Sequence, residues 1–62
     1  MININSIQVE IDAGYLYQLL AEKEADPAIA EIFREMSDIE YGHAKAFMAK
    51  NGMPLDKMPK PS

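Results

Sequence analysis

The sequence predicts an all-α protein built as one antiparallel hairpin of two helices. Apolar residues recur at helical spacing in two long segments, and an Asp-Pro break lies between them. In neither segment do apolar and polar residues alternate as they do in a strand. Because the connection between the segments is short, we expect the helices to pack antiparallel over residues 1–52.

The start and stop residues of the two helices follow from local chemistry. The first helix is expected from Asn5 or Ser6 to about Lys23 or Glu24. Asp26 is a good N-cap and Pro27 suits the first position of the second helix, which should run to about Lys50. Asn51-Gly52 is a stop signal. Residues 53–62 hold three prolines and little apolar material, which predicts a flexible tail.

Length and composition limit how this chain can be stabilised. With 62 residues it forms one small domain at most, and a core of that size is marginal alone. Cysteine is absent, which excludes disulfides and thiolate metal sites. A metal held by other ligands, association with further copies, or both are therefore expected.

Charge and hydropathy exclude several classes of partner. The net charge is −4 and the six basic residues are scattered, so nucleic acid binding is not expected. No apolar run approaches the ~18 residues of a membrane span. The N-terminal residues lack a basic leader. We expect a protein of the cytoplasm or of a protein-walled compartment.

The first helix has two apolar faces. The main stripe, flanked by Tyr17, consists of Val9, Ala13, Leu16 and Leu20. A second patch consists of Ile7, Ile11 and Gly14. One hairpin partner can cover only one face, so the second patch predicts a further helix from another chain.

The second helix carries two polar residues within its apolar stripe. That stripe consists of Ile29, Ile32, Phe33, Met36, Glu40, His43 and Phe47. A buried carboxylate is costly unless it is paired or binds a metal. Glu40 and His43 form a Glu-x-x-His motif, whose spacing directs both side chains to one face where they can hold the same ion.

A third candidate ligand lies at the same height on the first helix. Glu10 precedes the turn by about as many residues as Glu40 follows it, so both carboxylates sit at one level of an antiparallel hairpin. Four-helix proteins with two iron or manganese ions use two such sets of ligands, which a homodimer would supply. Oxygen-rich ligation with one imidazole per ion favours iron or manganese over structural zinc.

Three segments resemble the ferritin-like superfamily: Glu10–Tyr17, Ile32–Met36 and Glu40–Ala44. They are most similar to short rubrerythrin-like members and encapsulated ferritins, and also look like the ferritin-like domains of vacuolar-iron-transporter-type membrane proteins. The resemblance covers residues 6–49. It implies a ferritin-like four-helix bundle, formed here by a homodimer or a higher even-numbered oligomer.

The resemblance also implies roles for individual residues. Glu10 matches the first-helix ligand, Glu40 the bridging carboxylate, His43 the terminal imidazole, and Tyr17 a tyrosine found near such sites. The likeness to encapsulated ferritins implies an encapsulating shell as a partner, although residues 53–62 do not match their Gly-Ser-Leu docking tail. The chain also departs from full-length ferritins in having two helices, and from electron-passing rubrerythrins in lacking a cysteine-ligated iron domain.

The leading functional hypothesis is a di-iron centre of the ferroxidase type that oxidises Fe(II), for iron storage or peroxide detoxification. Glu10, Glu40 and His43 would be both its metal ligands and its catalytic residues. The alternative is a non-catalytic helical oligomerisation module stabilised by a metal. A third hypothesis is a helical dimerisation module that binds no metal.

Overall fold

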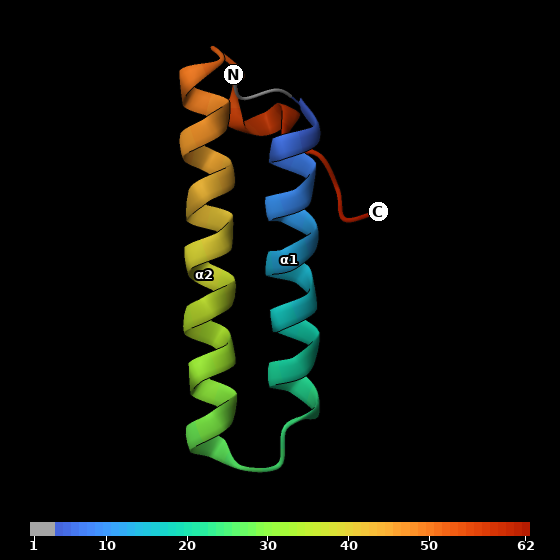
Figure 1. Ribbon diagram of the computed structural model, residues 1–62, viewed down its shortest axis with the longest axis vertical. Helices are drawn as coiled ribbons and strands as arrows, with labels where there is room; N and C mark the ends of the chain where they lie inside the picture. Colours follow the sequence, from blue (N-terminus) through green and yellow to red (C-terminus); the bar gives the residue numbers. More distant parts are fainter. Residues whose placement is uncertain (1–3) are drawn as a thin grey trace.

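The computed structural model describes residues 4–62 and shows an antiparallel pair of helices (Figure 1). Helix α1 spans Ile4–Lys23, helix α2 spans Pro27–Lys50, and a single 3-10 turn, η1, spans Leu55–Lys57. This stretch contains no strand, which confirms the predicted all-α hairpin. Helix α1 is already formed at Ile4, the first described residue, which is one or two residues before the expected start. Neither helix combines the length and apolar character that a bilayer crossing requires.

Capping residues fix both ends of α2. The Asp26 side chain accepts a hydrogen bond of 2.9 Å from the Ala28 N–H, and Pro27 occupies the first helical position. At the other end Gly52 adopts a positive φ of 67°. The Met53 N–H then donates to the Met48 carbonyl over 2.9 Å, which closes the helix end and turns the chain back. The predicted Asp-Pro start and Asn-Gly stop are both confirmed.

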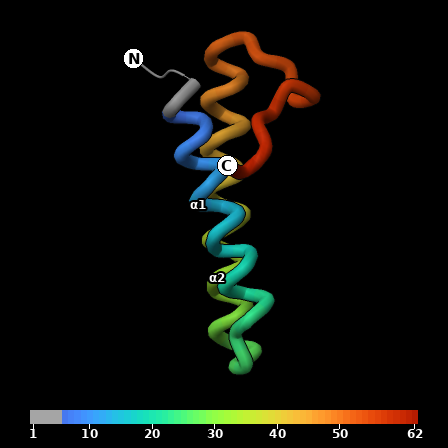
Figure 2. Tube along the Cα trace, turned by 90° about the vertical axis from the view of Figure 1, so that its right-hand side faces the viewer, coloured from blue at the N-terminus to red at the C-terminus, as the bar shows by residue number. Residues whose placement is uncertain are grey.

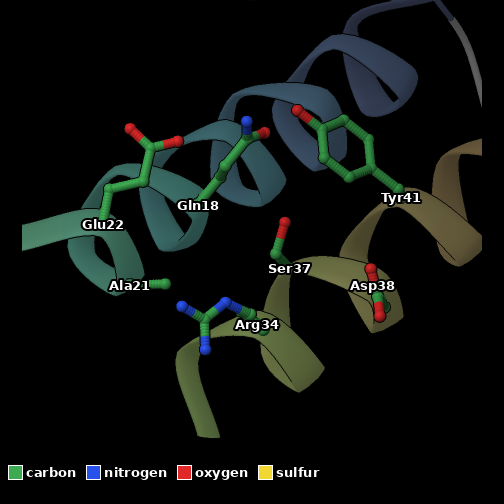
Figure 3. A pocket seen from close by; sticks show the side chains of 7 residues that line it. All are labelled: Gln18, Ala21, Glu22, Arg34, Ser37, Asp38 and Tyr41. Atoms are coloured by element: carbon green, nitrogen blue, oxygen red, sulfur yellow. The ribbon is translucent and has the colours of Figure 1, made fainter. Parts of the chain in front are cut away.

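The two helices approach each other along a line of small residues. The Ser37 hydroxyl, which points from α2 towards α1 (Figure 3), donates a hydrogen bond of 2.7 Å to the Gly14 carbonyl. A Cβ atom at Gly14 would lie 3.0 Å from the Tyr41 ring, so glycine is what allows this ring to pack there. Ala21, Ala30 and Ala44 are also buried. Small side chains on both helices therefore set the close approach.

The structure reverses the predicted roles of the two faces of α1. Ile7 and Ile11, from the second patch, are 0% and 1% exposed and pack within the hairpin. Val9 and Leu16, from the main stripe, are 62% and 55% exposed. Apolarity alone favoured the stripe with more large side chains, but the hairpin forms where small residues let the helices come close. The larger stripe is consequently open to a further chain.

Residues 53–62 cross the open end of the hairpin and continue along the side of α1 that faces away from α2 (Figures 1 and 2). Met53 and Met58 are half-buried against a core cluster, which consists of Ile7, Ile11, Ala44 and Met48. The sequence did not suggest this position. The flexibility expected of this segment stays a prediction.

Candidate metal centre

Three side chains from two helices meet at the Nδ1 atom of His43. The Glu10 Oε2 atom, from α1, lies 2.9 Å from His43 Nδ1. The Glu40 Oε1 atom, one turn before His43 on α2, lies 3.1 Å from the same nitrogen. The structure thus brings together the three residues that the sequence singled out as candidate ligands.

The spacing of these atoms suits a single small cation. One ligand atom from each of the three residues can be chosen so that all lie within 4.8 Å of one another. Two ligands bound at ~2.1 Å in neighbouring octahedral positions lie ~3.0 Å apart. The separations of His43 Nδ1 from the Glu10 and Glu40 oxygens, 2.9 and 3.1 Å, are close to this value. Carboxylate oxygens with one imidazole are the donor set that suits iron or manganese. These residues therefore fit the ion that the sequence suggested.

The site combines sheltered acids with an accessible imidazole. The side chains of Glu10 and Glu40 are 20% and 23% exposed, whereas that of His43 is 55% exposed. The hydrogen bond to Glu10 raises the pKa of His43 above its ordinary value, and Glu40 contributes in the same direction. A proton on Nδ1 therefore stabilises this arrangement when no metal is bound.

Tyr17, the predicted neighbour of the ligands, stacks on Phe33. The ring centroids are 6.3 Å apart with an interplanar angle of 21°. Tyr17 follows Glu10 by seven residues and Phe33 precedes Glu40 by seven, so antiparallel packing places both rings at one level. In the sequence Phe33 belongs to the apolar stripe, and the equal spacing of the two rings from the two glutamates is the only signal of their pairing.

One hairpin supplies only part of a metal centre. The three side chains offer four carboxylate oxygens and one ligating nitrogen. With a neutral imidazole they carry a charge of about −2, which balances one divalent cation. A pair of ions held in the manner of di-iron four-helix proteins requires a second set of the same ligands.

A separate cleft of about 360 Å³ lies between the helices (Figure 3). Its lining consists of Gln18, Ala21, Glu22, Arg34, Ser37, Asp38 and Tyr41. None of these is a candidate ligand. At roughly 100° per residue, Tyr41 points about 160° away from His43 around α2.

Comparison with known families agrees with this geometry. The profile of the rubrerythrin family matches residues 4–53, a stretch that includes both helices and all three candidate ligands. That family implies iron binding, and the Glu10, Glu40 and His43 group is able to hold a metal ion. Neither curated proteins nor solved structures give a significant match. Because the family match spans most of the sequence, the chain belongs to the rubrerythrin family and so to the ferritin-like superfamily.

Proposed function

We propose that two copies of this chain together bind a pair of iron ions and oxidise Fe(II). Each copy contributes Glu10, Glu40 and His43. The observation that carries the proposal is that both carboxylates lie about 3 Å from one imidazole nitrogen, on the side of the hairpin that also bears exposed apolar residues. Two such sets hold four negative charges, which two divalent cations neutralise.

The face around the candidate ligands supports association with a second copy. Large apolar side chains stay exposed there in the single chain: Val9, Leu16, Leu20, Ile29, Ile32 and Ile39. Fully burying one isoleucine or leucine contributes about 1.5–3 kcal/mol, so covering these half-exposed side chains favours association. Exposed apolar side chains that gather on one surface mark an interaction site, and helical spacing is consistent with such a surface here. A second copy brings both the apolar cover and the missing ligands.

The residues of the chain have distinct tasks in this proposal. Glu10 and Glu40 neutralise the charge of the metal, and His43 ligates through Nδ1 after its proton leaves to solvent. The surrounding apolar face limits the access of water once the second copy covers it. Bound Fe(II) would supply one electron per ion to dioxygen or peroxide; the ferric product would serve iron storage, and the reduction of peroxide would serve detoxification.

A ligand-deletion series tests the proposal. The variants Glu10→Ala, Glu40→Ala and His43→Ala are compared with the parent for anaerobic Fe(II) binding, and for the rate of oxidation after dioxygen or peroxide is added. Each is expected to lose more than about tenfold in Fe(II) affinity. Glu35→Ala is the matched control, because it removes an exposed acid from the same helix.

The outcomes separate the candidate functions. If Glu40→Ala and His43→Ala oxidise Fe(II) as fast as the parent, the proposal is wrong. Fe(II) binding by the parent without uptake of oxidant supports the non-catalytic, metal-stabilised oligomer instead. An absence of binding, with no shift in the unfolding midpoint, supports a dimerisation module that needs no metal.

A further inference from the structure

The segment Met53–Ser62, here named the C-terminal strap, contacts the turns of α1 that carry Glu10. Gln8 and Asp12 flank Glu10 by two positions each, and at roughly 100° per residue they point to the opposite side of the helix. Gln8 Nε2 donates a hydrogen bond of 2.8 Å to the Lys60 carbonyl. The Asp12 carboxylate accepts from the Ser62 N–H over 2.9 Å and from its hydroxyl over 2.7 Å.

The strap also contributes to the core beneath the same turns. Met53 and Met58 pack against the cluster that contains Ile7 and Ile11, which are fully buried. These two isoleucines lie within one turn of Glu10 on either side. The first turns of α1 are therefore held by α2 and by apolar and polar contacts with the strap.

Glu10 is the candidate ligand whose position depends most on such contacts. Glu40 and His43 lie on one helix, three residues apart, so α2 alone fixes their relative positions. Glu10 reaches them from another helix, whose first described residue, Ile4, lies only about two turns earlier. Helix ends open readily unless tertiary contacts hold them. Loosening this end of α1 would move Glu10 and leave the other two ligands in place.

We propose that the C-terminal strap is a positioning element for Glu10, and that it sets metal affinity without supplying a ligand. The proposal rests on the proposed metal-binding function. The strap acts on one face of the first turns of α1 while Glu10 occupies another. Losing its contacts should therefore weaken metal binding while the helical hairpin persists.

The first test compares Co(II) affinity in variants of the full chain. Met58→Ser is expected to weaken Co(II) binding about tenfold, as changes behind a ligand commonly do. Met58→Leu restores the apolar contact and should stay within about twofold of the parent. Leu55→Ser makes the same kind of change at a strap residue that is 60% exposed, so its affinity should equal that of the parent.

The second test needs no metal and follows the ring nitrogens of His43 by NMR. Glu10→Gln supplies the reference spectrum for a weakened contact between Glu10 and His43. Met58→Ser, and the double variant Gln8→Ala with Asp12→Ala that leaves the core intact, should move the His43 signals towards that reference. Far-UV circular dichroism checks that each variant remains helical.

The two readouts separate this inference from the proposed function. If the parent fails to bind Co(II) while the His43 signals move as expected, the metal-binding function is wrong and the strap still positions Glu10. The strap has no positioning role if the parent binds Co(II) and two further results hold. Met58→Ser and the double variant Gln8→Ala with Asp12→Ala would bind Co(II) as tightly as the parent, and the His43 signals of both would stay at the parental position.

Discussion

The imidazole of His43 and the carboxylate of Glu10 belong to different helices, yet His43 Nδ1 and Glu10 Oε2 lie 2.9 Å apart. Thirty-three positions separate the two residues in the sequence. Only the antiparallel packing of α1 on α2 brings them together, so this contact couples the fold of the hairpin to the candidate metal centre.

The first prediction concerns the metal-free protein and pH. The hydrogen bond to Glu10 raises the pKa of His43 above its ordinary value of about 6.5. At pH values below that ordinary pKa, the contact makes its full contribution to the stability of the folded chain. This contribution is lost as pH rises through the raised pKa of His43. NMR titration should show His43 releasing its proton at a higher pH than an unperturbed histidine, and Glu10→Gln should lower that midpoint. Equal midpoints in the parent and in Glu10→Gln would contradict the contact.

A second prediction concerns competition between protons and the metal. Because His43 Nδ1 must be free of its proton to ligate, Fe(II) or Mn(II) affinity should increase as pH rises through the raised pKa of His43. Isothermal titration at several pH values should also show proton release on binding at the acidic end of this window. An affinity that does not change across the window would exclude His43 Nδ1 as a ligand.

The third prediction concerns the exposed apolar face. Ile32→Glu places a charge on a side chain that is 54% exposed in the single chain and that a second copy would cover. We expect this variant to be monomeric by sedimentation at concentrations where the parent forms dimers or larger even-numbered oligomers. Gln18→Glu adds the same charge in the cleft, about 160° around α1 from the exposed Leu16, and should leave association unchanged. Dimers of equal stability in all three proteins would rule out this interface.

The fourth prediction compares two glycines in the helices. Alanine at Gly42 meets no atom within 4 Å, so Gly42→Ala should stabilise the hairpin by about 0.5–1 kcal/mol through helix propensity. Alanine at Gly14 gains the same propensity, but its Cβ lies 3.0 Å from the Tyr41 ring, which must move. We expect Gly14→Ala to be less stable than Gly42→Ala by about 1 kcal/mol or more in urea unfolding. Equal stabilisation would mean that the close approach at Gly14 does not constrain packing.

The fifth prediction concerns stabilisation by the metal. At a hundred times its dissociation constant, a ligand specific for the folded state stabilises that state by about 2.7 kcal/mol. Fe(II), Mn(II) or Co(II) should therefore raise the unfolding midpoint of the parent, and should do so much less for His43→Ala. The same shift in both proteins would place the stabilising ion elsewhere.

The sequence predicted the helices and the candidate ligands because both depend on local patterns. Asp26-Pro27 and Asn51-Gly52 mark helix ends by their own chemistry, and the structure confirms both. The convergence of Glu10 with Glu40 followed from equal distances to the turn, which regular helices preserve.

The rotation of the helices and the position of the C-terminal strap could not be predicted in the same way. Counting apolar residues favoured the stripe with Leu16, but the small residues around Gly14 and Ser37 determine which faces meet. The strap is held by contacts such as those of Gln8 with Lys60 and Asp12 with Ser62. These pairs are far apart in the sequence, and nothing in their local context indicates a partner.

The most direct test of the shared centre is anomalous scattering at the iron absorption edge, from crystals grown with Fe(II). We predict two iron ions at the interface of two copies, each within bonding distance of Glu10, Glu40 or His43 side chains from both. Iron bound by one copy alone, or located away from these three residues, would contradict a centre that two hairpins complete.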